Sequence, residues 1–205
     1  MFAKRAFDLV VSACALVVLS PVMVLLGIGV RLDSPGPALF RHRRVGRHGR
    51  AFNVLKFRTM VHRPDSSGPQ VTTATDARIT RLGALLRRTK LDELPQFLNV
   101  LAGDMSLVGP RPEVAHYVAM YPDAVRSEIL ALLPGMTDLA SIEFRDEQEL
   151  LAAAADPEST YIREILPRKL ELYLQYARQN SLWLDLKILL VTISALFFGG
   201  GSKKG

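Results

Sequence analysis

Two adjacent carboxylates, Asp92 and Glu93, are the residues of this chain whose types and spacing best suit chemistry. They lie in the run TKLDELPQ and follow two arginines, Arg87 and Arg88. A carboxylate can attack phosphorus as a nucleophile, and a second carboxylate can bind a metal ion or move a proton. Neighbouring cations can hold phosphate oxygens, so the pattern is typical of a site that handles phosphate.

A purely structural role also fits the same dipeptide. Because proline is tolerated only in the first turn of a helix, Pro95 predicts a helix that begins near Asp92. Aspartate is a leading N-cap residue, so Asp92 could simply cap that helix. The sequence alone supports the cap and the chemical role equally, because a helix N-terminus attracts phosphate as well as carboxylate.

A second candidate phosphate ligand is Arg111, which stands between Pro110 and Pro112. The prolines fix the backbone on either side, and the planar guanidinium suits a bidentate phosphate contact. A rigid turn with a solvated arginine is the alternative.

The sequence pattern predicts two short strands joined by a turn, over residues 38–45 and 51–60. They carry a dense set of cations, namely Arg41, Arg43, Arg44, Lys56 and Arg58. Beside an apolar N-terminal segment, these cations favour contact with anionic lipid headgroups or a phosphorylated ligand over a merely solvated face. No nucleic-acid-binding module is recognisable, so we expect no nucleic acid partner.

The N-terminal residues 9–30 are almost wholly apolar and long enough to cross a bilayer as one helix. Basic residues flank them on both sides, with Lys4 and Arg5 before and the stretch 31–50 after. A cleaved signal peptide is one interpretation, although the apolar core is long for one. A plain transmembrane helix is another, but it would place one basic flank outside, against the usual bias of basic loops toward the cytoplasm.

A third interpretation rests on Ser20-Pro21 in the middle of this segment. Pro21 lacks an N–H and clashes with the preceding turn, and the Ser20 hydroxyl can bond a freed backbone group. We favour two short helices in a re-entrant hairpin with both ends on one face, although a kinked spanning helix also satisfies the backbone. Asp8, just inside the segment, is expected to pair with Lys4 or Arg5.

The length and the net charge of the chain limit its possible architectures and partners. The chain has 205 residues, a formal net charge of +6 and a single cysteine, Cys14, so no internal disulfide can form. The basic excess suits an anionic partner. We expect a mostly helical α+β protein with a small β-hairpin. A re-entrant membrane helix would occupy residues 1–32, and a catalytic domain with amphipathic or interfacial C-terminal helices would occupy 33–205.

The rest of the chain supports coarser expectations. Residues 62–76 predict a mobile loop that could cover a site, and residues 161–179 predict an amphipathic helix bent or split by Pro167. Residues 183–198 predict a nearly apolar helix that either packs into the core or lies at a membrane interface, with equal support. No chemistry can be assigned to residues 142–164.

Several short motifs follow one another along the chain in an order that is highly specific. They are Leu-Asp-Glu-Leu-Pro-Gln at 91–96, Gly-Asp-Met-Ser at 103–106 and Gly-Pro-Arg-Pro at 109–112. Leu-Lys-Phe-Arg-Thr-Met at 55–60 and Ser20-Pro21 extend the match. With these motifs the chain resembles the bacterial sugar transferases, small monotopic phosphoglycosyl transferases that load a lipid carrier.

The resemblance implies transfer of a sugar-1-phosphate from a nucleoside diphosphate sugar, usually a UDP-sugar, to polyprenyl (undecaprenyl) phosphate, with release of UMP. It implies that Asp92 is the nucleophile and forms a covalent aspartyl phosphosugar. Glu93 would bind Mg²⁺ with Asp92 or assist proton movement, and Lys56, Arg87 and Arg111 match positions near phosphate. The implied setting is the cytoplasmic face of a bacterial inner membrane, at the first membrane step of glycan biosynthesis.

One stretch departs from the family pattern. The family often reads Pro-Gly-x-Thr-Gly with a following Gln, whereas this chain reads PGMTDLAS over 134–141. The donor sugar therefore cannot be carried over. A non-catalytic basic membrane adaptor and a phosphotransferase that moves no sugar are the rival functions. The sequence leaves the pathway and any homo-oligomer open.

Overall fold

The protein is described by a computed structural model that covers residues 2–61 and 76–198. In chain order its elements are α1 (Phe2–Asp33), β1 (Leu39–Val45), η1 (Arg47–Gly49), β2 (Ala51–Phe57), α2 (Arg81–Thr89), η2 (Leu91–Glu93), α3 (Gln96–Ala102), β3 (Ser106–Val108), α4 (Ala115–Val118), α5 (Asp123–Leu130), β4 (Gly135–Thr137), α6 (Leu139–Glu143), α7 (Glu147–Ala153), α8 (Pro157–Thr160), η3 (Tyr161–Ile165), α9 (Leu166–Gln179) and α10 (Leu182–Phe198). The fold is mostly helical, as predicted. The predicted mobile loop lies almost wholly outside the described residues.

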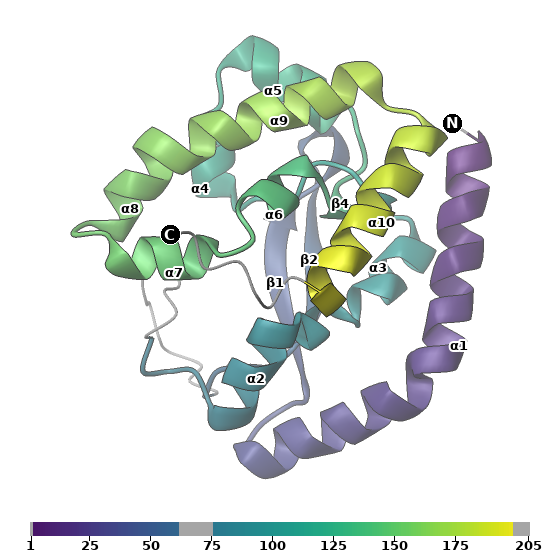
Figure 1. The fold of residues 1–205 in the computed structure, drawn as a ribbon, viewed down its shortest axis with the longest axis vertical. Helices are drawn as coiled ribbons and strands as arrows, with labels where there is room; N and C mark the ends of the chain where they lie inside the picture. The colour runs from purple at the N-terminus through teal and green to yellow at the C-terminus, as the bar shows by residue number, and fades with distance from the viewer. Residues whose placement is uncertain (1, 62–75, 199–205) are drawn as a thin grey trace.

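Helix α1 runs down one side of the molecule and then turns beneath α2 (Figure 1). It is a single helix of 32 residues that contains Pro21, and the Ser20 hydroxyl donates to the carbonyl of Val17 over 2.9 Å. The sequence predicted two short helices, whereas the structure has one continuous helix with a bend. In the described part of the chain, α1 is long and apolar enough to cross a membrane.

Strands β1 and β2 form the predicted hairpin through the middle of the molecule (Figure 1), in register from Leu39↔Phe57 to Val45↔Ala51. The second strand ends at Phe57, earlier than expected, and Arg58 follows it. Its buried guanidinium donates to the carbonyls of Val30, Ser34, Pro35 and Pro37 and to the Ser34 hydroxyl. The prediction that Arg58 meets lipid or phosphate is therefore wrong, since this side chain fixes the linker after α1.

Strands β3 and β4 form a small parallel pair that the sequence did not reveal. Gly109 and Gly135 let the two backbones touch, because a Cβ on Gly135 would lie 2.1 Å from the Gly109 nitrogen. This close approach holds the Gly-Pro-Arg-Pro stretch directly against β4.

The C-terminal helices build most of the largest buried cluster and one apolar surface. Asp156 is the N-cap of α8, and its carboxylate accepts from the Ser159 N–H. Pro167 lies in the first turn of α9, after the π-helical turn η3, where its missing N–H is harmless. Helix α10 buries Ile188 but leaves Trp183 79% exposed, so it contributes both to the core and to an outer apolar face.

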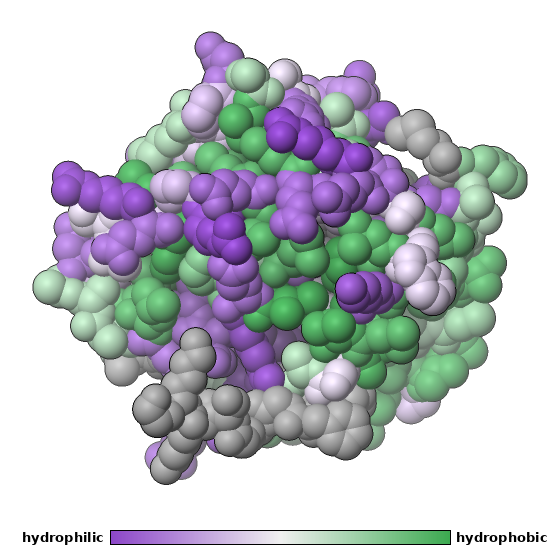
Figure 2. Space-filling model, turned by 45° about the horizontal axis from the view of Figure 1, so that its top comes forward, coloured by the Kyte–Doolittle hydropathy of each residue, from purple (hydrophilic) through white to green (hydrophobic). Residues whose placement is uncertain are grey.

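Apolar side chains also cover the outer face of α1, where they include Val17, Val18 and Leu25. Figure 2 shows the contrast between this apolar side and the polar side chains that lie over α9. Contiguous exposed apolar patches on a protein surface mark sites of membrane or protein contact. The inner face of α1 packs on two of the buried clusters, through Phe7 and Val11 in one and Val30 in the other.

Candidate active site

The carboxylate pair lies in a tight turn between two helices. Helix α2 ends at Thr89, and Lys90 adopts a left-handed conformation (φ 57°) that reverses the chain. Asp92 and Glu93 then occupy the short 3-10 helix η2. The predicted capping role of Asp92 is wrong, because α3 begins three residues after Glu93, its N-cap residue is Pro95, and no side chain caps it.

Glu93 is the anchor of a cation cluster. Its carboxylate accepts from Lys56 Nζ over 2.7 Å, and both of its oxygens accept from the guanidinium of Arg111. Burial raises the pKa of Glu93, but Arg111 and Lys56 outweigh that effect and hold it well below its usual range. Three residues predicted separately from the sequence are thus brought together, and Glu93 is ionised.

Asp92 has the opposite environment although it is the next residue along the chain. It is 7% exposed, and its Oδ1 is buried without a hydrogen-bond partner among the described residues. Burial and the neighbouring Glu93 raise the pKa of Asp92, while Lys56, Arg87 and Lys90 oppose that rise. A buried carboxylate oxygen with no partner is costly, and such groups commonly mark catalytic or ligand sites.

Arg87 has a buried side-chain nitrogen, Nη1, whose N–H groups make no hydrogen bond to the described residues. Helix α2 approaches the end of the hairpin at Gly83, where a Cβ would lie 2.1 Å from the Thr59 carbonyl oxygen. This contact lets Arg87 Nε donate to the Thr59 hydroxyl over 2.8 Å. Within residues 2–61 and 76–198, Nη1 of Arg87 is buried and has no partner. Burial lowers the pKa of Arg87, and Asp92 acts against that effect. We call Lys56, Arg87, Asp92, Glu93 and Arg111 the phosphate cluster.

The loop that carries Arg111 is held on both sides. Arg111 Nη1 donates to the Met136 carbonyl of β4 over 3.2 Å. Downstream, buried Glu113 accepts from Arg44 over 3.0 Å and from the Tyr161 hydroxyl over 2.6 Å. Sequence reasoning missed Glu113 and Tyr161, because the partners are 48 residues apart and neither lies in a recognisable pattern.

His42 lies at the edge of this site on the face of the hairpin that also carries Lys56. Its Nδ1 is 3.3 Å from Arg44 Nη2, which fits a neutral ring that accepts at Nδ1. Burial, then Arg44, Lys56 and Arg111, lower the pKa of His42 to about 3. The ring is therefore uncharged at neutral pH.

A magnesium ion would find few protein ligands here. The described residues contain no group of three or more His, Cys, Asp or Glu side chains that could hold a metal. Both oxygens of Glu93 are occupied by cations, which leaves the carboxylate of Asp92, whose buried Oδ1 has no partner among the described residues, as the free carboxylate of the pair. This donor set fits Mg²⁺ that is shared between one carboxylate and substrate phosphates, and it does not fit an all-protein site.

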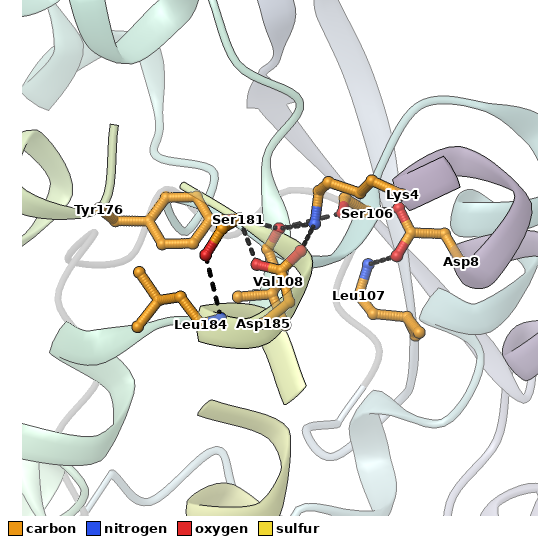
Figure 3. A network of polar contacts seen from close by, with 9 residues as sticks. All are labelled: Lys4, Asp8, Ser106, Leu107, Val108, Tyr176, Ser181, Leu184 and Asp185. Carbon is orange, nitrogen blue, oxygen red and sulfur yellow. Dashed lines mark hydrogen bonds and ion pairs between the residues drawn. The ribbon is translucent and has the colours of Figure 1, made fainter. Parts of the chain in front are cut away.

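A second buried polar cluster fastens the N-terminal helix to the body of the protein. Lys4 Nζ contacts Asp185 over 2.6 Å, and the Tyr176 hydroxyl contacts the other oxygen of Asp185 over 2.7 Å. Asp8 accepts from the Ser106 hydroxyl and from the Leu107 N–H (Figure 3). The predicted pairing of Asp8 with Lys4 or Arg5 is therefore wrong. We call Lys4, Asp8, Ser106, Tyr176 and Asp185 the fastening cluster.

Comparison with known proteins identifies the family. The family model described as bacterial sugar transferase matches residues 1–199, and the chain belongs to this family. It is 38% identical over 193 residues to the UDP-glucose:undecaprenyl-phosphate glucose-1-phosphate transferase of Escherichia coli (strain K12), covering 93% of this chain and 39% of that protein.

Two further relatives agree with this assignment. The chain is 35% identical over 204 residues to the UDP-N-acetylgalactosamine-undecaprenyl-phosphate N-acetylgalactosaminephosphotransferase of Aeromonas hydrophila, covering 98% of this chain and 45% of that protein. It is 40% identical over 201 residues to a UDP-glucose:undecaprenyl-phosphate glucose-1-phosphate transferase of Caulobacter vibrioides, covering 94% of this chain and 69% of that protein. The chain thus spans less than half the length of the first two relatives.

Proposed function

We propose that this protein transfers a sugar-1-phosphate from a UDP-sugar to undecaprenyl phosphate, with Asp92 as the nucleophile. The observation that carries the proposal is the buried, unpartnered oxygen of Asp92 beside three cations that suit phosphate, namely Lys56, Arg87 and Arg111. Glu93 holds Lys56 and Arg111 in place. The names of the relatives supply the substrate classes. They differ in the sugar, so the donor sugar of this chain is left open, and they lend no support to an adaptor function.

In the first step a carboxylate oxygen of Asp92 attacks the sugar-bearing phosphorus of the donor. The bond from that phosphorus to the bridging oxygen breaks, and UMP leaves with the electron pair. In the second step an oxygen of undecaprenyl phosphate attacks the same phosphorus, and the bond to Asp92 breaks. One site can in this way serve a soluble substrate and a lipid substrate in turn, which predicts ping-pong kinetics.

Three cations of the phosphate cluster, Arg87, Lys56 and Arg111, neutralise the negative charge of the donor phosphates. Arg87 Nη1 has no competing contact among the described groups and can bind a phosphate oxygen directly. Lys56 and Arg111 are preordered by Glu93, so they need little reorganisation when the donor arrives. Mg²⁺, held by Asp92 and the donor phosphates, would supply further charge neutralisation.

The same proposal includes membrane association on the cytoplasmic face of the inner membrane. Its support is the apolar outer face of α1 and the exposed Trp183 and Leu190 of α10. The bend of α1 in Figure 1, a helix that contains Pro21, suits a segment that enters and leaves on one face. Cysteine labelling on both flanks of α1, in the Cys14→Ala background, should report the cytoplasmic side only. Labelling from the periplasm near Lys4 would exclude the re-entrant arrangement.

Asp92→Asn tests the nucleophile. The variant should bind membranes like the wild type, yet UMP release from UDP-sugars in the presence of undecaprenyl phosphate should fall by about 10⁴-fold. Labelled phosphosugar should remain on the wild-type protein after acid quenching, when lipid is withheld, and should be absent from the variant. Turnover at the wild-type rate in Asp92→Asn would overturn the assignment.

Glu93→Gln tests the second carboxylate separately. Loss of its charge releases Lys56 and Arg111, the cations that occupy both of its oxygens. Because Mg²⁺ is assigned to Asp92 and the donor phosphates, we expect kcat/KM for the UDP-sugar to fall while the Mg²⁺ titration superimposes on that of the wild type. A weaker dependence of turnover on Mg²⁺ concentration would instead assign a metal role to Glu93.

A further inference from the structure

The carbonyl oxygen of Val108 is the point where three distant parts of the chain meet. Lys4 Nζ of α1 donates to it over 3.0 Å, and the Tyr176 hydroxyl of α9 lies 3.1 Å from it. Both side chains also contact Asp185 of α10, which is 1% exposed. Figure 3 shows Lys4 and Asp185 converging on Val108, with the Tyr176 ring on the opposite side from Lys4.

Val108 is the last residue of β3, and Arg111 follows three residues later. The chain between them has little freedom. Gly109 is pressed against Gly135, and Pro110 has a fixed φ. A displacement of the Val108 carbonyl is therefore transmitted to Arg111 instead of being absorbed by the loop.

A second contact from the same end of α1 reaches the other half of the active site. Arg5 donates to the carbonyls of Met105 and Leu101 over 3.4 Å and 3.3 Å. Leu101 lies in the last turn of α3, the helix that follows Asp92 and Glu93, where the helix dipole favours a cation. The N-terminal turn of α1 thus contacts both segments that carry active-site residues. Arg5 contacts α3, which follows Asp92 and Glu93, and Lys4 contacts Val108, which precedes Arg111.

We propose that Lys4, Tyr176 and Asp185 are positioning residues for the transfer reaction, which fix the Val108 carbonyl and thereby place the Arg111 guanidinium for the donor phosphate. Lys4 and Arg5 flank the apolar segment like headgroup-binding residues, but their observed contacts are with the protein. This inference rests on the proposed function, because that function assigns Arg111 to the donor.

A double-mutant cycle between Tyr176→Phe and Arg111→Lys tests the proposal. Tyr176→Phe keeps the buried ring and removes the hydroxyl that contacts Val108 and Asp185. It should lower kcat/KM for the UDP-sugar about tenfold and raise the donor KM, because a small displacement of a phosphate ligand weakens both binding and catalysis. KM for undecaprenyl phosphate should not change.

The effects of the two substitutions on kcat/KM for the UDP-sugar should not multiply. When Arg111 is already replaced by lysine, the bidentate contact is lost, and the removal of the Tyr176 hydroxyl should lower kcat/KM by less than about twofold more. Arg178→Gln is the control on the same helix, since it breaks an exposed ion pair with Glu128. Its small effect should multiply with that of Arg111→Lys.

The outcomes separate this inference from the proposed function. Effects of Tyr176→Phe and Arg111→Lys that multiply, with an unchanged donor KM, would overturn the positioning role while Asp92→Asn stays inactive. Turnover by Asp92→Asn would instead overturn the proposed function. If Tyr176→Phe does not accumulate as folded protein, Lys4→Arg serves in its place. It keeps a cation beside Asp185 while changing the donor to Val108, and the same rise in donor KM is expected.

Discussion

The phosphate cluster and the fastening cluster each carry two carboxylates, yet they differ in how completely those carboxylates are bonded. In the fastening cluster each oxygen of Asp8 and Asp185 has a hydrogen-bond partner. In the phosphate cluster Glu93 is doubly paired, but Asp92 Oδ1 has no partner within the described residues.

The difference separates two uses of buried charge. A fully bonded polar network fixes the positions of the elements that contribute to it, and one open group in such a network is expensive unless a ligand completes it. The fastening cluster accordingly joins α1, α9 and α10 to β3. The phosphate cluster keeps a carboxylate oxygen and an Arg87 nitrogen available. The contrast predicts that substitutions in the two clusters affect different properties.

The largest expected effect on stability comes from the fastening cluster. Lys4→Met removes the cation but leaves Asp185 buried, so the free energy of unfolding should fall by about 3 kcal/mol. Chemical denaturation in detergent micelles measures this loss. An unchanged unfolding midpoint would show that the pair does not hold α1 to the body of the protein.

A smaller effect of opposite sign is expected in the phosphate cluster. The pKa of Asp92 is raised in the folded state, so its carboxylate destabilises the fold at pH values above that pKa. Asp92→Asn should therefore be more stable than the wild type at pH 7.5, by about 1 kcal/mol. The advantage should shrink as the pH falls through the folded-state pKa and should vanish only well below about 4, where the carboxyl is protonated in the unfolded state as well.

Thermal unfolding of both proteins at pH 7.5 and at pH 4.5 measures this difference. A variant that is less stable than the wild type at pH 7.5 would mean that Asp92 is bonded in the folded protein. The comparison between the two clusters would then lose its basis.

The smallest effect should come from a pair outside both clusters. Arg178 and Glu128 form an exposed ion pair between α9 and α5. Arg178→Gln should change the free energy of unfolding by no more than about 0.5 kcal/mol, because water and salt screen exposed pairs. Arg178→Gln is the reference against which the changes in the free energy of unfolding of Lys4→Met and Asp92→Asn are compared. A change as large as that of Lys4→Met would show that the assay does not report on burial.

The phosphate cluster could be predicted in large part from the sequence because its residues lie in local motifs. The charge pattern around Asp92 and Glu93 and the two prolines beside Arg111 point to those residues, and the resemblance to the bacterial sugar transferases adds Lys56 and Arg87. That Lys56 and Arg111 meet on Glu93 is a tertiary fact. The capping interpretation failed because the chain forms a 3-10 turn before α3, and local propensity does not distinguish these geometries.

The fastening cluster could not be predicted, because its partners are far apart along the chain. Lys4 and Arg5 have the composition of a membrane flank, and nothing local distinguishes a lysine that meets lipid from one that meets Asp185. Asp8 likewise has cations within one helical turn, which made a local pair the natural expectation. The neighbouring β3–β4 pair escaped prediction because its strands are three residues long.

The ion pair between Lys4 and Asp185 joins residues 181 positions apart, and this separation sets an order of events during synthesis. At about 5–20 residues per second, a ribosome takes roughly 10 to 35 seconds to travel that distance. The apolar α1 has left the ribosome long before Asp185 exists. Under the proposed membrane association, α1 can therefore enter the bilayer before the fastening cluster closes. The loop that carries Arg111 gains this upstream support late in synthesis, only after Asp185 has been made.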